Sequence, residues 1–292
     1  MKDKMSMILS MIIFGTIGIF VELIALPSGL IASFRGISGA LIIIIVMFLR
    51  GHKPDFESIK KKLWLLALSG VAIGFNWILL FEAYRHTGIP VATVCYYTAP
   101  IIVMALSPFI LKEKLKLKQI ICILLALCGL VAVSGVLQGG TSKFFGVALG
   151  LGAAMLYASV VLMNKFMGEV PAYEKTAIQL ITAGLVVLPY ALFTSSDISF
   201  NTKSLVLLLI VGIVHTGFAY LLYFDAVKKL KAQTVAIFSY IDPASAIILS
   251  AIIFMQIPKG SEIIGAALIM CGAFFSEIDF QKNKKVTYDT SK

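Results

Sequence analysis

The 292-residue chain is strongly apolar: 59% of its residues are hydrophobic, 14% are charged, and its mean hydropathy is +0.97. Soluble domains contain roughly 45–50% apolar and about 25% charged residues, so the composition excludes a soluble domain and predicts an all-α integral membrane protein. The net charge of +10 is spread over alternate loops, which argues against a nucleic-acid partner. The four cysteines lack metal-type spacing, and no metal or other cofactor is predicted.

Ten segments approach the roughly 20 apolar residues that a helix needs to cross a bilayer. We therefore predict ten transmembrane helices joined by short connections. In chain order they are Met5–Leu26, Gly29–Leu49, Leu63–His86, Gly88–Leu111, Leu117–Leu137, Phe144–Phe166, Ala172–Thr194, Ser204–Val227, Ala232–Met255 and Ser261–Ile278. The first apolar stretch continues past Val21 without a small-residue cleavage site, so we expect a retained first helix and not a signal peptide.

The basic residues predict the orientation of these helices. With a cytoplasmic N-terminus, the inner segments carry 20 lysines and arginines, and Arg35 lies inside a helix. The outer loops carry only four, which are Arg85, Lys143, Lys203 and Lys259. This distribution follows the positive-inside rule and places both termini in the cytoplasm. The basic excess is then expected to contact anionic lipid.

A fixed offset of 143 residues aligns the second half of the chain with the first without a gap. Sixteen of the 56 positions from Gly74 to Gly129 are identical to their partners. Other partners are similar, such as Glu82 with Asp225, Arg85 with Lys228, Trp77 with Tyr220, and Phe14 with Tyr157. Each half holds five predicted helices, an odd number, so the second copy is expected to insert upside down. Inverted repeats of this kind are typical of secondary transporters.

The order FEAYRHTGIP VATVCYYTAP … LSPFILKEKL … GLVAV, with a weaker second copy and FGTIGIF in the first helix, resembles the drug/metabolite transporter superfamily in its ten-helix EamA branch. The resemblance extends to about residue 278. It implies two five-helix repeats, at 1–140 and 141–280, before a cytoplasmic polar tail at 281–292. It also implies a non-enzymatic, multi-pass transporter of the bacterial plasma membrane. One departure is Glu113, which matches an acid usual in the family but falls on Gln256 in the second copy.

Two ionisable residues, His215 and Asp242, fall near the middle of their predicted helices, where a charge tends to face a cavity or a partner. Alanine occupies both positions in the first repeat, so the repeat is broken where function needs asymmetry. His215 is either a neutral imidazole bonded between helices or a group for proton coupling or substrate binding. Asp242 either caps the bend expected at Pro243 or binds an amino group or a coupling proton.

Aromatic and polar residues at matching depths predict the wall of a substrate site. Sites for small ligands are mostly apolar with a few polar groups that fix orientation, although aromatic residues of membrane helices are otherwise used for packing. The expected substrate-binding residues are Phe14, Asn76, Trp77, Tyr96, Tyr97, Tyr157, His215, Tyr220, Tyr240 and Asp242, with Thr16 and Ser159 as further hydrogen-bonding groups.

Charged residues near the helix ends form two expected clusters. The outer cluster contains Glu22, Arg35, Glu82 and Arg85, and the inner cluster contains Lys165, Asp225 and Lys228. These residues either anchor the helix ends by snorkelling, form paired gates that close each face in turn, or contact substrate directly.

Together these patterns favour a secondary active transporter that moves a small polar metabolite across the plasma membrane by alternating access. An amino acid or related compound is favoured as substrate, export is favoured as direction, and a proton is the candidate coupling ion. The same acid and aromatic residues also suit efflux of lipophilic cations. A remote alternative is an intramembrane serine hydrolase, because GISG at 36–39 resembles the rhomboid serine motif and His215 could supply a base. The oligomeric state is not indicated.

Overall fold

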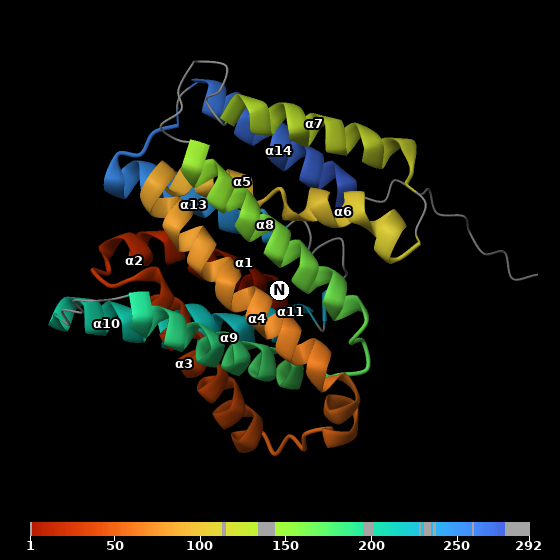
Figure 1. The fold of residues 1–292 in the computed structure, drawn as a ribbon, viewed down its shortest axis with the longest axis vertical. Coiled ribbons are helices and arrows are strands. Elements are labelled where there is room, and N and C mark those ends of the chain that lie inside the picture. Colours follow the sequence, from red (N-terminus) through yellow and green to blue (C-terminus); the bar gives the residue numbers. More distant parts are fainter. Residues whose placement is uncertain are drawn as a thin grey trace, which may run out of the picture.

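The computed structural model describes residues 2–112, 115–133, 144–194, 201–227, 229–230, 235, 238–258 and 260–277. Within these ranges every regular element is a helix, and the helices run together in one bundle (Figure 1). Seven helical segments are long and apolar enough to cross a membrane, and three shorter apolar helices accompany them. Phe48 and Phe193 are 82% and 90% exposed on the outside of the bundle. An apolar exterior of this kind is suited to lipid.

The first half contains α1 (Lys2–Gly15), α2 (Ile17–Leu23), α3 (Ser28–Leu49), α4 (Phe56–Thr87), α5 (Ile89–Tyr96), α6 (Ala99–Ile110) and α7 (Leu117–Val133). The second half contains α8 (Phe144–Lys165), α9 (Ala172–Thr194), α10 (Thr202–Ile210), the π-helix η2 (Val211–Phe218), α11 (Ala219–Val227), α13 (Ile241–Phe254) and α14 (Gly260–Glu277). Three groups form continuous membrane-length segments: α1 with α2, α5 with α6, and α10 with η2 and α11. The tail predicted at 281–292 lies outside the described residues.

The helix α4 begins before the predicted Leu63 because polar contacts extend it beyond its apolar part. The Asp55 carboxylate accepts a hydrogen bond from the Ser58 amide at 3.1 Å, which caps the first turn. The hydrogen bonds from Ser58 also lower the pKa of the Asp55 carboxyl. One turn later, Lys61 pairs with Glu57 at 2.7 Å. An apolar-run criterion does not detect such a turn.

Prolines interrupt two of the helical segments. α5 ends at Tyr96 and α6 begins at Ala99, so the helix breaks immediately before Pro100. Pro243 lies in the first turn of α13, where its missing N–H breaks no helical hydrogen bond. Both breaks fall beside aromatic residues of the predicted substrate site.

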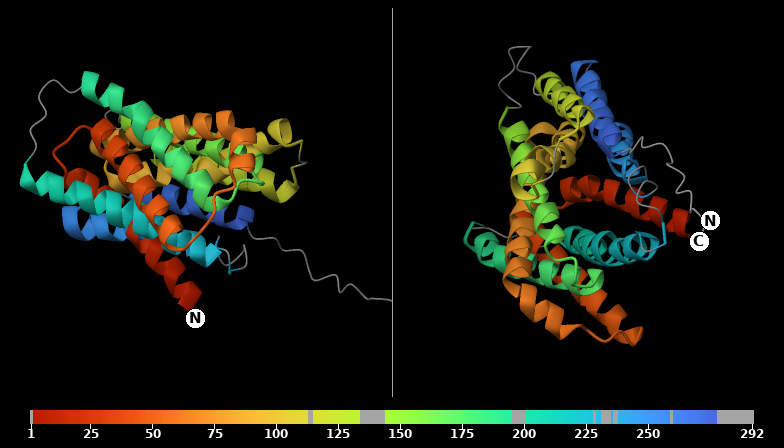
Figure 2. Two further views of the ribbon diagram at one scale, coloured as in Figure 1. Left: turned by 90° about the horizontal axis from the view of Figure 1, so that it is seen from below. Right: turned by 90° about the vertical axis from the view of Figure 1, so that its right-hand side faces the viewer.

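The ends of the helices define two faces of the bundle. On the first, here called the N-terminal face, Asp3 of α1 pairs with Lys229 after α11 at 3.1 Å, and the end of α3 contacts α9 and α11. The right-hand view of Figure 2 looks along the bundle from this side. On the opposite face, here called the far face, the start of α8 lies against the end of α4. There, a Cβ atom on Gly146 would be 2.6 Å from Cβ of Thr87.

Contacts between helices follow the same 143-residue offset as the sequence. α3 packs on α9 and α7 packs on α14, and each of these pairs is its own equivalent. α4 packs on α8 and α9, as α11 and η2 pack on α1 and α3. A Cβ atom on Gly129 would lie 2.7 Å from the carbonyl oxygen of Gly265, and one on Gly272 would lie 2.9 Å from that of Cys122. Adding 143 to one contact gives the other.

The backbone also repeats at a conformation that side chains rarely adopt. Among the described residues other than glycine, Lys112 and Met255 have positive φ angles, of 56° and 53°. They are 143 residues apart, and each follows the helix end of its half. The side chain of Gln256, next to Met255, accepts a hydrogen bond from the Ile89 amide at 3.0 Å and so ties the end of α13 to the start of α5.

Candidate functional site

A cavity of about 790 Å³ lies in the middle of the bundle. Its walls come from α1, α3, α4, α5, α6, α8, α11 and α13. It extends to Lys165 and Val227, which are the last residues of α8 and α11, so it reaches the N-terminal face. Nine of the ten predicted substrate-binding residues line it: Phe14, Asn76, Trp77, Tyr96, Tyr97, Tyr157, Tyr220, Tyr240 and Asp242.

The lining of this central cavity contains pairs of residues related by the 143-residue offset. Both members of eight pairs lie in the wall. The pairs are Phe14 with Tyr157, Trp77 with Tyr220, Leu80 with Tyr223, Tyr84 with Val227, Tyr96 with Ser239, Tyr97 with Tyr240, Ala99 with Asp242, and Val103 with Ala246. The cavity is therefore built from equivalent positions of the two halves, and its polar character differs between them.

Aromatic rings form most of the wall. Phe14 lies 5.3 Å from Tyr220 between ring centroids, and Tyr96 lies 5.4 Å from Tyr157. These distances are typical of stabilising aromatic pairs. Such a wall offers an apolar, polarisable surface with hydroxyl groups at its edges.

Asp242 places a carboxylate in this wall. It lies in the first turn of α13, and its Oδ2 accepts a hydrogen bond from the Tyr97 hydroxyl at 2.7 Å. Tyr97 occupies the break between α5 and α6, so the bond joins the two proline-interrupted segments. Within the described residues Oδ1 has no hydrogen-bond partner, which leaves it for a ligand in the cavity.

Arg35 does not lie at the outer mouth, where the sequence analysis placed it. It is buried in the central cavity, and its guanidinium lies over the Trp77 ring with Cζ 4.2 Å from the centroid. Its Nε donates a hydrogen bond to Thr216 Oγ1 at 2.9 Å. The side chain therefore turns inward to Trp77 and Thr216 and away from Glu22 and Glu82.

His215 was predicted to bind substrate, but it does not line the central cavity. It is buried in η2, its Nε2 lies 2.8 Å from Thr16 Oγ1, and its ring is 4.6 Å from that of Phe20. The imidazole therefore bonds η2 to the junction of α1 and α2. This geometry matches the interhelical reading of His215 given by the sequence.

The other predicted hydrogen-bonding groups are engaged with backbone carbonyls. Asn76, although it lines the cavity, donates its side-chain amide to the carbonyl of Ala153 on α8. Thr16 also donates to Ile13 O at 2.7 Å, and Ser159 donates to Leu156 O at 2.6 Å. Neither Thr16 nor Ser159 lines the cavity.

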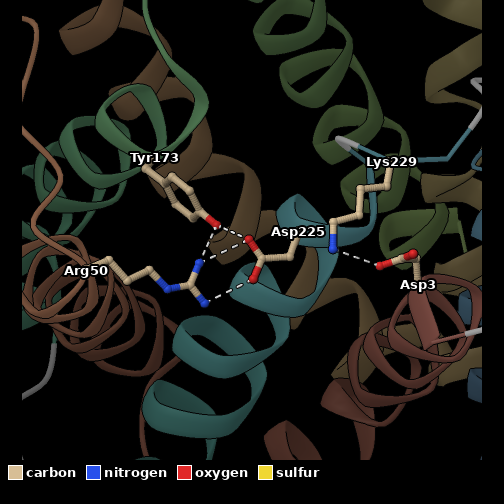
Figure 3. Close-up of polar contacts among 5 residues, drawn as sticks. All are labelled: Asp3, Arg50, Tyr173, Asp225 and Lys229. Atoms are coloured by element: carbon tan, nitrogen blue, oxygen red, sulfur yellow. Dashed lines mark hydrogen bonds and ion pairs between the residues drawn. The ribbon is translucent and has the colours of Figure 1, made fainter.

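A charged cluster joins helix ends on the N-terminal face, as Figure 3 shows. Arg50 donates one hydrogen bond to each carboxylate oxygen of Asp225, at 3.1 and 3.0 Å, and a third to the Tyr173 hydroxyl at 3.2 Å. Tyr173 also donates to Asp225. Sequence analysis assigned Asp225 to this face with Lys165 and Lys228. Lys165 instead lines the cavity, and Lys228 lies outside the described residues.

The far face carries the other predicted charges. Arg85 donates to Glu82 at 3.3 Å and to the carbonyl of Leu26 at 2.6 Å, which ties α4 to the loop before α3. Glu22 is partly buried on α2 and interacts electrostatically with Arg85. A second pocket, of about 610 Å³, is lined by Glu82, Arg85 and this loop.

The sequence profile of the EamA-like transporter family matches residues 4–135 and again residues 144–277. This chain belongs to that family. It is a transporter and a multi-pass membrane protein. The two matches cover nearly all of the described helices, one match in each half.

Several relatives of this EamA protein are described as transporters. The uncharacterized transporter YxxF of Bacillus subtilis is 28% identical over 96% of this chain and 91% of its own length. The uncharacterized transporter YetK of the same organism is 27% identical over 87% and 79%. Protein RarD of Escherichia coli is 26% identical over 72% and 70%. One solved crystal structure aligns over 94% of this chain and 96% of its own, with a TM-score of 0.66 and 19% identity, and so shares the fold.

Two residues of the EamA protein stand apart from the hydrolase alternative. The Ser38 hydroxyl donates to the carbonyl of Phe34 at 2.6 Å, while the described partners of His215 are Thr16 and the carbonyl of Ile210. A serine nucleophile needs its base within hydrogen-bond reach, and these two side chains are bonded elsewhere. The arrangement does not support a catalytic pair.

Proposed function

We propose that this EamA-family transporter is a secondary active transporter that carries an amino acid or a related small zwitterion through the central cavity. The observation that carries the proposal is the Asp242 carboxylate, held by Tyr97 in an aromatic wall. A carboxylate in this setting attracts an ammonium group, and the surrounding rings add cation–π attraction. The first half has Ala99 at the equivalent position, so the proposed ammonium site is single.

We propose ten transmembrane helices in two inverted five-helix repeats, made from the seven long segments and the three shorter ones. Support comes from the eight residue pairs in the cavity wall and from helix contacts that exchange under the same offset. The direction of the chain also supports inversion, because α1 begins at the N-terminal face whereas α8 begins at the far face. A site between inverted repeats is the usual position for a transported substrate.

We propose that transport proceeds by alternating access, with both termini in the cytoplasm of a bacterial cell and export as the direction. The central cavity reaches the N-terminal face, whereas the pocket beside Arg85 and Glu82 is separate from it. The buried rings of Phe81 and Tyr84 lie near this boundary on α4. In this arrangement a cytoplasmic substrate enters the cavity, and a rocking motion of the repeats then opens the far face.

We propose a proton as the coupling ion, with Asp242 as its site. A carboxylate that binds an ammonium group in one half of the cycle and a proton in the other would exchange the two across the membrane. His215 is less suited to this role because its imidazole is bonded to Thr16 outside the cavity.

Efflux of lipophilic cations is the second candidate, and the aromatic wall with its single acid supports it. Arg35 in the same cavity argues against it, because a fixed cation repels a cationic drug that has no negative group. A zwitterion satisfies both charges.

The test uses purified protein in liposomes that contain a pH-sensitive dye, with a panel of amino acids, amines and organic cations added outside. We expect a pH change in the lumen with an amino acid and its loss in Asp242→Asn. Glu57→Gln removes an exposed carboxyl remote from the cavity and serves as the matched control. A pH change only with lipophilic cations would favour the second candidate. Equilibration of labelled amino acid without proton movement would mean that the coupling proposal is wrong.

A further inference from the structure

The three arginines of the chain differ in what their guanidinium groups contact. Arg50 uses both terminal nitrogens on Asp225 and Tyr173, and Arg85 uses both on Glu82 and the Leu26 carbonyl. Arg35 bonds through Nε alone, to Thr216. Within the described residues, its Nη1 and Nη2 have no hydrogen bond or ion pair. Arg35 is also the most buried of the three, with 6% of its surface exposed.

These terminal nitrogens are open to the cavity. Arg35 is a lining residue, and its nitrogens are absent from the side-chain atoms that are both sealed from solvent and unbonded in the described structure. A guanidinium carries five N–H donors in a planar fork that matches a carboxylate or a phosphate. After the bond from Nε to Thr216, four donors remain for a ligand.

The surrounding helices hold Arg35 in one orientation. The Trp77 ring from α4 lies against one face of the guanidinium, and Thr216 from η2 fixes Nε. Thr216 Oγ1 also donates to the Val211 carbonyl at 3.1 Å, five residues earlier, which is the spacing of the π-helix. π-helical turns often occur at functional sites. Here the turn supplies the acceptor that orients the arginine.

Neutralising Asp242 does not account for this arrangement. Both residues line the cavity, yet within the described residues they form no ion pair at 4.0 Å or less. Asp242 bonds to Tyr97, and Arg35 bonds to Thr216. A charge inside the membrane-spanning region tends to be retained for a partner or a ligand. The two charges thus lie on the same cavity wall as separate, oriented groups.

We propose that Arg35, stacked on Trp77 and anchored by Thr216, is an anion subsite that binds the carboxylate of the transported molecule. Resting on the proposed function, this assigns the amino group to Asp242 and the carboxylate to Arg35, and it requires the substrate to carry both charges. A charge-assisted hydrogen bond contributes about 1.5–3 kcal/mol, so a ligand without its carboxylate should bind about tenfold or more weakly.

The test compares four ligands with one carbon skeleton. L-Leucine carries both charges, 4-methylpentanoate lacks the amine, 3-methylbutylamine lacks the carboxylate, and L-leucinamide replaces the carboxylate by a neutral amide. Their dissociation constants are measured by calorimetry on the purified full chain. In the wild-type protein, leucine is expected to bind at least about tenfold more tightly than leucinamide. Equal binding of the two would overturn the proposal without any variant having to fold.

Three variants then assign the effect to Arg35. In Arg35→Gln, leucine and leucinamide are expected to bind within about threefold of each other, because the charge that distinguishes them is gone. Arg35→Lys keeps the charge but not the fork, and it should retain part of the discrimination. Thr216→Val keeps the arginine, loses its anchor and should reduce the ratio. An unchanged leucine-to-leucinamide ratio in Arg35→Gln would overturn the proposal.

The design separates this inference from the proposed function. If none of the leucine ligands binds the wild-type protein, the amino-acid proposal fails. The anion subsite is then judged on benzoate against benzamide and on glucose 6-phosphate against glucose. Preference for the anionic member in either pair, lost in Arg35→Gln, supports the subsite. No preference in either pair would overturn it as well.

Discussion

Arg50 at the end of α3 holds Asp225 at the end of α11 in a bidentate ion pair, with N–O distances of 3.1 and 3.0 Å. Tyr173 at the start of α9 bonds to both partners. The pair joins three helices on the face that the central cavity reaches. It therefore holds α11 in the conformation in which the cavity extends to this face.

Loss of this pair should favour closure of the N-terminal face. The two side chains are 51% and 39% exposed, and ion pairs of this exposure contribute about 0–1 kcal/mol, which corresponds to at most about a fivefold change in population. Labelling of Ser239→Cys in the cavity, in a background without native cysteines, measures access. We expect Asp225→Asn to slow labelling by up to about fivefold. The charge-reversed pair Arg50→Glu with Asp225→Lys should restore it, and faster labelling in Asp225→Asn would contradict the prediction.

Thr16→Val should destabilise the protein because it leaves the buried His215 imidazole without its interhelical partner. A buried polar group left unpaired costs about 1–3 kcal/mol. We expect a lower melting temperature in detergent for Thr16→Val and near-normal stability for Thr16→Ser, which keeps the hydroxyl. Ligand affinity should change little, since neither residue lines the cavity. A large change in leucine affinity with unchanged stability would return His215 to the substrate site.

Gly36→Ala should also lower the melting temperature, for a steric reason. A Cβ atom on Gly36 would lie 2.6 Å from the Leu180 carbonyl oxygen and 2.8 Å from the Gly184 nitrogen, so α3 and α9 would have to separate. Overpacking of this kind typically costs about 1–3 kcal/mol. Gly168→Ala is the matched control, because an added Cβ there would meet nothing within 4 Å. Equal melting temperatures for the two variants would contradict the described helix contact.

Cysteine labelling in cells tests the proposed orientation. Lys53 follows α3 at the N-terminal face, and Lys203 lies in the first turn of α10 at the far face. A maleimide that cannot cross the membrane should react with Lys203→Cys in intact cells and with Lys53→Cys only after lysis. The reverse pattern would place the termini outside and reverse the export direction.

Much of the fold could be predicted because hydropathy and a long repeat report on it directly. The helical membrane class and the transporter family were confirmed, and Pro100 correctly indicated a break near Tyr97. The start of α4 was wrong by seven residues, from the predicted Leu63 to the observed Phe56. Asp55 and the Glu57–Lys61 pair extend that helix by polar contacts that a hydropathy criterion cannot detect.

The site was predicted less completely, for reasons that lie in packing. The offset of 143 residues brought the aromatic residues to matching depths, and they line one cavity, although their binding role stays a prediction. The direction of the Arg35 side chain depends on Thr216, which is 181 residues away. The side of His215 depends on η2, because a π-helical turn shifts the face on which a residue lies and hydrophobic periodicity does not detect the shift.

The most direct measurement is counterflow of labelled L-leucine into liposomes preloaded with unlabelled leucine, which needs no coupling ion. We predict transient accumulation of label by the wild-type protein and by Glu57→Gln. We predict at least about a tenfold loss in Asp242→Asn, because the carboxylate that binds the ammonium group is absent. Tyr97→Phe should cause a smaller loss that does not add to that of Asp242→Asn, since the two act through one bond. Accumulation of label by Asp242→Asn at the wild-type rate would contradict the assignment of the central cavity as the substrate site.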